Sequence, residues 1–358
     1  MKKIAYIELD THSEIALNFM ELMNDSALFS VDYYFSEKIL KTLGLQETDN
    51  IKKVSAENIL QNLSQYQLPN TKYDLVLIGT VHRYFNVFEK IAEQFNTSII
   101  CHNLNFVKAS NFDLLSSIFK EDFQYRLKLF LKEGLLRKSK VYEKAKNLLV
   151  LDRGFENFVR KPLVYAQPDK YKFLPIFYTK FSGKSENETY TIVIPGAVSQ
   201  KRRDYERVLK SVKNFRFPFE IIFLGKASGK ELEMLQNFEQ TKPENISIKY
   251  FTEKVPQDIF DDYMQKADVL WCPIQQETEF FSQKEIYGFT KMSGNIGDAV
   301  KFGKLAVFPE NYPSKYSFII PEKGSLGDFL FTKKDVDFSE FSKEKVLQEL
   351  EKTIFALL

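Results

Sequence analysis

The sequence has little cysteine, no long hydrophobic run and no excess of charge of either sign. Its two cysteines, Cys101 and Cys272, stand far apart without the spacing of a metal site, so we expect a reducing, cytoplasmic environment. No stretch approaches the run of about 18 apolar residues that a membrane-spanning helix needs. The 50 basic and 48 acidic residues leave a formal net charge of +2, which gives no global electrostatic reason to bind nucleic acid. We therefore expect a globular protein without a membrane span or a nucleic-acid partner.

The hydrophobic pattern predicts two domains of the same α/β kind. A chain of 358 residues is long for one core and comfortable for two. Apolar runs of strand length alternate with helical patterns in the first half, and the rhythm resumes after a polar segment at residues 182–188. Such alternation predicts parallel, doubly wound sheets. The predicted strands are residues 4–9, 30–34, 73–79, 98–102, 148–151, 191–194, 219–225, 246–251, 267–274 and 305–308.

One segment of the second half places an acid on either side of a glycine-rich turn. It begins with Glu285-Ile-Tyr-Gly-Phe and continues with Asp298-Ala-Val-Lys-Phe-Gly, between a strand-like run and the next strand. Acids near a helix start can accept hydrogen bonds from sugar hydroxyls, while the free backbone N–H groups and the helix dipole favour a phosphate. A simple helix cap with a tight turn is the alternative interpretation.

This segment resembles the donor-binding segment of GT-B glycosyltransferases, closest in pattern to the retaining Glu-x7-Glu type. It departs from that pattern because the second acid is Asp298 and the spacing between the acids is longer. The resemblance implies two Rossmann-like domains facing across a cleft. It implies an acceptor domain at residues 1–183, a nucleotide-sugar donor domain at 184–340, and a terminal helix at 341–358 that packs back toward the first domain. It also implies a catalytic role for Glu285 at the donor sugar. Asp298 and the inserted Ser293, Gly294 and Asn295 are expected to bind the donor.

A basic loop opens the second domain. Gly196 follows a predicted strand, and Lys201, Arg202 and Arg203 precede a helical pattern. Cations and free N–H groups at a helix start can neutralise a diphosphate, and arginine can do so with two parallel hydrogen bonds. A solvated charge run is the alternative. The loops after the next two strands are weaker candidates for nucleotide contact, and they contribute Gly225, Lys226, Thr252 and Glu253.

Three histidines complete the sequence's candidates for chemistry. His12, His82 and His102 each lie at or just after the end of a predicted strand of the first domain. Ligands of open α/β sheets bind at that edge, near the switch in strand order, although a single histidine is more often a satisfied surface or core residue. The resemblance implies either that His102 contacts the donor sugar, beside Asn103 in place of the usual Asp, or that His12 is a base. Asp10, Thr11, His82 and Asn103 form the predicted acceptor side.

Two further patterns concern metals and membranes. Asp335-Val336-Asp337 has the pattern that holds a metal in another glycosyltransferase class, but it stands in a turn-like segment, so we expect neither a metal nor a cofactor. Residues 118–146 carry nine Lys or Arg among apolar and aromatic residues. Such a basic amphipathic segment can lie on an anionic membrane, although ordinary surface helices look similar.

The sequence thus predicts a cytoplasmic glycosyltransferase that moves a sugar from a nucleotide-diphosphate donor to a saccharide or lipid-linked saccharide, as in the synthesis of bacterial cell-surface polysaccharide. A sugar-nucleotide epimerase shares this cleft and is the enzymatic alternative. A non-catalytic sugar-nucleotide-binding scaffold is the alternative from another class. The sequence leaves the sugar, the stereochemistry and the oligomeric state open.

Overall fold

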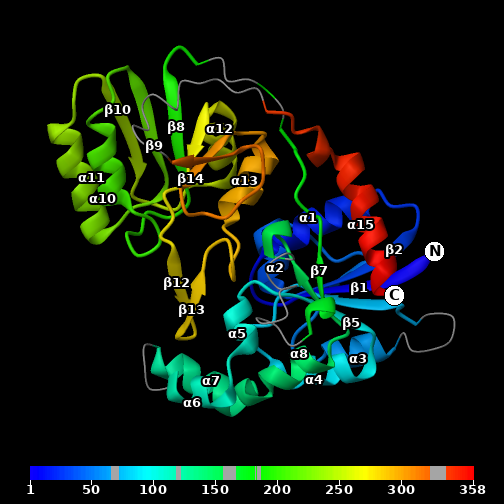
Figure 1. The fold of residues 1–358 in the computed structure, drawn as a ribbon. Helices are drawn as coiled ribbons and strands as arrows, with labels where there is room; N and C mark the ends of the chain where they lie inside the picture. Colours follow the sequence, from blue (N-terminus) through cyan, green and yellow to red (C-terminus); the bar gives the residue numbers. More distant parts are fainter. Residues whose placement is uncertain (66–71, 118–121, 156–166, 182, 184–186, 323–335) are drawn as a thin grey trace.

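The computed structural model describes residues 1–65, 72–117, 122–155, 167–181, 183, 187–322 and 336–358. Two parallel sheets, each covered by helices, form two domains (Figure 1). The first sheet has seven strands in the order β3-β2-β1-β4-β5-β6-β7, and the second has six in the order β10-β9-β8-β11-β14-β15. The predicted doubly wound α/β architecture is confirmed.

The first sheet is buried on both faces because its strands alternate their apolar side chains. In β1 (Lys2–Glu8), Ile4 and Tyr6 join one core, while Ala5 and Ile7 join the other. The remaining strands are β2 (Phe29–Phe35), β3 (Ile51–Lys53), β4 (Leu75–Ile78), β5 (Thr97–Ile100), β6 (Asn147–Val150) and β7 (Tyr171–Phe173). The helices around them are α1 (Ser13–Met23), α2 (Glu37–Leu43), α3 (Ile59–Ser64), α4 (Phe85–Gln94), α5 (Leu104–Lys108), α6 (Asn111–Ser117), α7 (Phe123–Lys132) and α8 (Lys138–Lys144).

The second sheet repeats this plan. Its strands are β8 (Tyr190–Pro195), β9 (Phe219–Lys226), β10 (Ile246–Phe251), β11 (Val269–Trp271), β14 (Ala306–Pro309) and β15 (Ile319–Glu322). The helices α10 (Tyr205–Val212) and α11 (Gly229–Thr241) cover one face, and α12 (Gln257–Lys266) and α13 (Gly294–Phe302) cover the other. None of the helices in the described part of the chain combines the length and apolar character needed to cross a bilayer.

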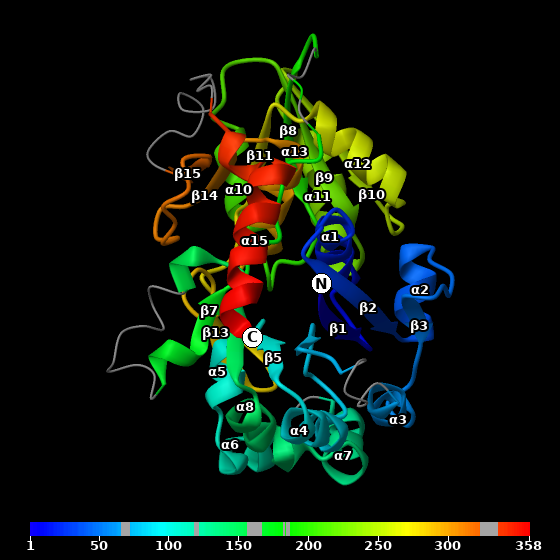
Figure 2. The ribbon, with the colours of Figure 1, turned by 90° about the vertical axis from the view of Figure 1, so that its right-hand side faces the viewer.

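Two elements connect the domains. The terminal helix α15 (Lys343–Leu357) returns to the first domain, where Val346, Leu350 and Ile354 are buried in a core shared with α1, as predicted (Figure 2). The antiparallel hairpin of β12 (Glu277–Phe280) and β13 (Gln283–Ile286) extends from the second domain to α5 of the first (Figure 1). Its tip residue Phe281 is buried in the core of the first domain.

Candidate functional site

The three histidines meet at the carboxyl edge of the first sheet. The chain leaves this edge after β1, β4 and β5, and the strand order switches direction between β1 and β4. The His12 and His102 rings stack with centroids 3.7 Å apart and an interplanar angle of 10°. The His82 ring lies 6.0 Å from His12 and 6.1 Å from His102. The shared edge expected from the sequence therefore corresponds to a compact histidine cluster.

The three rings differ in their partners. His102 donates Nε2–H to the Gly79 carbonyl at 2.9 Å. Burial, followed by the nearby His12, lowers the pKa of His82 to about 3 and holds the pKa of His102 well below its usual range. His12 remains about one-third exposed, and its Nδ1 lies 3.3 Å from a carboxylate oxygen of Glu14. Of the three, His12 alone pairs with an acid, which leaves its Nε2 to accept a proton.

Glu8 fixes the loop that carries His12. It ends β1 with only 1% of its surface exposed, and it accepts hydrogen bonds from Thr80 Oγ1 at 2.7 Å and from the Asp10 and Thr11 backbone N–H groups at 3.1 and 3.2 Å. Burial raises the pKa of Glu8 from 4.5 to about 7. Sequence reasoning missed this residue, although an acid at the end of an otherwise apolar strand was the available signal.

The basic loop of the second domain is folded around Arg203. Gly196 has a φ of 102°, and a Cβ at that position would lie 2.6 Å from Arg203 Nη2. Arg203 donates from Nη1 to the Ala197 carbonyl at 3.2 Å and from Nη2 to Asn295 Oδ1 at 3.3 Å. Its buried Nε has no hydrogen-bond partner within the described part of the chain. Lys201 and Arg202 extend into solvent beside it.

Arg203 and the start of α13 form one polar chain. Asn295 donates to the Pro195 carbonyl at 3.4 Å and to Asp298 Oδ2 at 3.1 Å, and Ser293 caps the helix. Burial raises the pKa of Asp298 from 3.8 to about 6, despite the opposing effects of Asn295 and nearby cations. Glu14 of the first domain adds a smaller upward effect. Asp298 therefore lies close enough to Glu14, two residues after His12, for the two carboxylates to interact across the domain interface.

Lys291 makes a direct contact between the two sides. Its Nζ donates to Asn103 Oδ1 at 2.6 Å, and Asn103 Nδ2 donates to His82 Nε2 at 3.4 Å. Burial lowers the pKa of Lys291, and the Lys291 charge in turn disfavours protonation of His82 and His102. The loop between the two acids therefore closes against the histidine cluster.

Glu285 lies apart from these groups. It stands on β13, is fully buried, and accepts hydrogen bonds from the backbone N–H groups of Asn105 at 3.2 Å and Phe106 at 2.9 Å. It thereby caps the start of α5 in the other domain, while the buried Lys138 donates to three carbonyls at the end of the same helix. Both carboxylate oxygens of Glu285 already have partners, so the structure gives this acid a role in joining the domains.

The weaker candidates occupy the outer rim. Lys226, Thr252 and Glu253 are exposed at the ends of β9 and β10, with Lys226 Nζ 3.4 Å from Glu253. Gly225 is buried behind Gly196, and a Cβ there would lie 2.3 Å from the Gly196 carbonyl oxygen. Asp335 lies outside the described residues, within which no cluster of three or more acid, histidine or cysteine side chains could hold a metal.

Comparison with solved structures identifies the fold. No protein-family model matches the chain, and no curated protein matches it in sequence. The chain superposes on Anabaena HepE in complex with UDP, with a TM-score of 0.59, 9% identity, and 99% and 100% of the two chains covered. The lipopolysaccharide outer core galactosyltransferase WaaB, in its apo form, gives a TM-score of 0.56, 12% identity, and 99% and 100% coverage. The chain has the GT-B fold.

The same fold also includes enzymes with a different reaction. The UDP-GlcNAc 2-epimerase from Neisseria meningitidis bound to UDP-GlcNAc gives a TM-score of 0.53, with 10% identity and 99% and 100% coverage. Because all these identities are low, the likeness concerns the fold. The choice between reactions depends on the residues of this chain.

Proposed function

We propose that the chain is a glycosyltransferase that transfers a sugar from a nucleoside-diphosphate sugar to a saccharide hydroxyl. The proposal rests on the observation that two chemically different groups of residues face each other across the domain interface. A cationic loop and the start of α13 lie on one side, and the His12–Glu14 pair lies on the other. The Glu14 charge acts on Asp298, and Lys291 Nζ donates to Asn103 Oδ1, so the two sides meet. GT-B neighbours bound to UDP and to UDP-GlcNAc support the assignment of the donor.

In this proposal the second domain holds the diphosphate. Arg203 is already oriented by Ala197 and Asn295, so little side-chain entropy remains to be lost on binding. The dipole of α13, whose start lies beside Arg203, and the exposed Lys201 and Arg202 add positive potential. These groups stabilise the negative charge that the diphosphate gains as its bond to the sugar breaks.

The first domain supplies the base. The acceptor hydroxyl gives its proton to His12 Nε2 while its oxygen forms the bond to the anomeric carbon, and the bond between that carbon and the diphosphate oxygen breaks with its electrons on the diphosphate. Glu14, bonded to Nδ1, orients the imidazole and stabilises its protonated form. His102 is neutral and hydrogen-bonded to Gly79, so we assign it a packing role against His12.

Glu285 has no chemical step in this mechanism because its oxygens are occupied by α5. A closer relation to the retaining Glu-x7-Glu enzymes therefore remains a prediction. A base that activates the acceptor directly favours a single displacement instead.

Nucleotide-sugar titrations test the donor assignment. We expect the wild-type protein to be stabilised against thermal unfolding by UDP or another nucleoside diphosphate and to release that diphosphate from one nucleotide sugar of a panel. Arg203→Ala should weaken diphosphate binding by roughly tenfold or more, because it removes a charge-assisted hydrogen bond to the diphosphate. Lys230→Ala, an exposed cation on α11, is the matched control. Equal binding by Arg203→Ala and wild type would refute the donor site.

The epimerase remains the second candidate, since its fold neighbour has comparable similarity. Conversion of UDP-GlcNAc into its 2-epimer in the absence of any acceptor would favour it over transfer.

We also propose peripheral contact with an anionic membrane through α6 and α7. Phe112 is 79% exposed and Leu131 is 68% exposed, and Phe123 is partly exposed on the same pair of helices. Lys128 and Lys132 are exposed beside them. Exposed apolar side chains with neighbouring lysines suit an anionic lipid surface.

Co-sedimentation with vesicles tests this contact. We expect salt-sensitive binding to phosphatidylglycerol-containing vesicles, loss of binding in Phe112→Ser/Leu131→Ser, and no binding to neutral phosphatidylcholine vesicles. Binding to neither type of vesicle at low salt would remove the proposal.

A further inference from the structure

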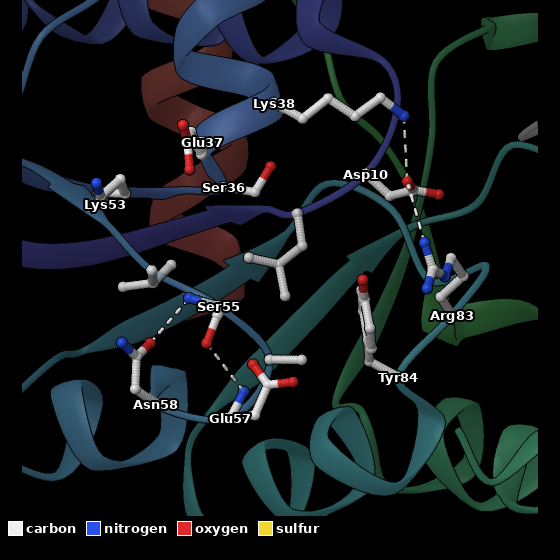
Figure 3. Close-up of a pocket in the computed structure, with 13 residues that line it drawn as sticks. Asp10, Ser36, Glu37, Lys38, Lys53, Ser55, Glu57, Asn58, Arg83 and Tyr84 are labelled. Atoms are coloured by element: carbon white, nitrogen blue, oxygen red, sulfur yellow. Dashed lines mark hydrogen bonds and ion pairs between the residues drawn. The ribbon is translucent and has the colours of Figure 1, made fainter. Parts of the chain in front are cut away.

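A cavity separate from the histidine cluster opens at the same edge of the first sheet. It measures about 380 Å³ and lies at the ends of β1, β2 and β3 and beside the loop after β4 (Figure 3). This volume falls within the range of small-molecule sites. Asp10 forms part of its wall and lies two residues before His12 in the same loop, so the cavity adjoins the proposed reaction centre.

Tyr84 is held in an unusual conformation at this cavity. Its φ of 55° is left-handed, a conformation that bulky residues rarely adopt. The buried Glu133 binds Arg83 through Nε at 3.0 Å and Nη2 at 2.6 Å, and it also accepts the Tyr84 backbone N–H at 3.3 Å. The Arg83 guanidinium lies 4.7 Å from the centre of the Tyr84 ring. A partly buried ion pair therefore fixes a strained aromatic residue whose hydroxyl points into the cavity (Figure 3).

The cavity is lined by three cations (Lys38, Lys53 and Arg83) and three carboxylates (Asp10, Glu37 and Glu57). Lys38 Nζ lies 3.2 Å from Asp10, and Arg83 lies 3.8 Å from the same carboxylate (Figure 3). On the opposite wall, the Ser55 backbone N–H donates to Asn58 Oδ1 at 2.8 Å, which fixes the loop after β3. The cavity thus offers fixed donors and acceptors, an aromatic ring and the apolar Leu9 and Val54, with no excess of charge among its lining side chains.

This combination selects a class of ligand. A phosphate would meet as many carboxylates as cations, and an apolar ligand would cover charged groups at a desolvation cost. A neutral sugar fits the polar groups and the aromatic ring of the cavity, because its hydroxyls donate and accept hydrogen bonds and its C–H face packs on an aromatic ring.

We propose that this cavity binds a neutral sugar unit of the acceptor, distal to the unit that receives the transferred sugar. The inference rests on the proposed transferase function and deepens it. The acceptor is then a neutral oligosaccharide that extends from the His12 loop over Asp10 to Tyr84, and a monosaccharide would leave the cavity empty.

Binding to the full-length protein tests the proposal. The probes are chitotriose, maltotriose and cellotriose, with their monosaccharides and the acidic trisaccharide 3′-sialyllactose for comparison, measured by saturation-transfer NMR. We expect at least one neutral trisaccharide to bind more tightly than its monosaccharide and than sialyllactose. Tyr84→Gly removes the ring and relieves the left-handed strain, so it should fold while weakening that binding about tenfold. Tyr84→Phe should bind within a few-fold of wild type.

The outcomes separate this proposal from the transferase function. Unchanged trisaccharide binding in a folded Tyr84→Gly, preference for sialyllactose, or no binding of any neutral trisaccharide overturns the acceptor cavity, whether or not nucleotide sugars are turned over. Tyr84-dependent trisaccharide binding without any nucleotide-sugar binding supports the cavity and overturns the transferase function. Lys230→Ala, an exposed cation on α11 of the other domain, should leave trisaccharide binding unchanged.

Discussion

Replacing Glu285 by alanine distinguishes its observed role from the catalytic role that the sequence resemblance implies. The change leaves the backbone N–H groups of Asn105 and Phe106 buried without their acceptor. Each unsatisfied group costs about 1–3 kcal/mol. Part of this cost is offset because burial raises the pKa of Glu285, so the buried charge itself is unfavourable. We expect a net local destabilisation of about 2 kcal/mol, or roughly 30-fold in the opening equilibrium of α5.

Amide hydrogen exchange measures this effect at the residues concerned. The Asn105 and Phe106 amides should exchange roughly 30-fold faster in Glu285→Ala, with an intermediate effect in Glu285→Gln, which keeps one acceptor oxygen. Glu277→Ala is the control, because Glu277 lies on the same hairpin with about half of its side chain exposed. Unchanged exchange at both amides, together with a hundredfold loss of nucleotide-sugar turnover, would refute the structural role and restore the catalytic one.

Three other substitutions test particular contacts. Burial raises the pKa of Glu8 from 4.5 to about 7, so ionisation of Glu8 should lower the free energy of unfolding by up to about 3 kcal/mol as the pH rises from about 4.5 to 7. In urea unfolding, Glu8→Gln should flatten this dependence of stability on pH, and an unchanged dependence would contradict the buried position of Glu8. Gly225→Ala should displace the Gly196 carbonyl and weaken nucleoside-diphosphate binding, measured by calorimetry. The control is Gly183→Ala, whose added Cβ meets open space. Equal affinities of the two variants would contradict a role of the Gly196 loop in diphosphate binding. Phe281→Ala should cost about 3 kcal/mol in urea unfolding, since its ring lies 5.4 Å from Phe106 in the core of the first domain; a cost under about 1 kcal/mol would show that the hairpin tip does not hold the domains together.

The sequence was most informative where function follows from strand order. The positions of His12, His82 and His102 after apolar runs predicted a common sheet edge, because parallel strands end at one edge. The α15 contact with the first domain was also predicted, from the family resemblance rather than from the residues alone.

The sequence could not predict contacts that depend on the two domains meeting. Glu285 binds amides about 180 positions earlier in the chain, and no local pattern encodes such a pairing. The β12–β13 hairpin lacks a glycine turn signal. Phe281 and Ser282 instead adopt the left-handed φ values of 53° and 57° at its tip. The left-handed conformation of Tyr84 could not be predicted from the sequence either, since tertiary contacts set such conformations in bulky residues.

The most direct measurement is the mass of an acceptor oligosaccharide after incubation with the protein and each nucleotide sugar of the panel. We predict a product heavier by one sugar unit with at least one donor. We also expect His12→Ala to lower the rate by roughly 10²–10⁴-fold, the usual contribution of a general base, with diphosphate binding unchanged. Full activity of His12→Ala, or epimerised nucleotide sugar without any extended acceptor, would contradict transfer at the domain interface.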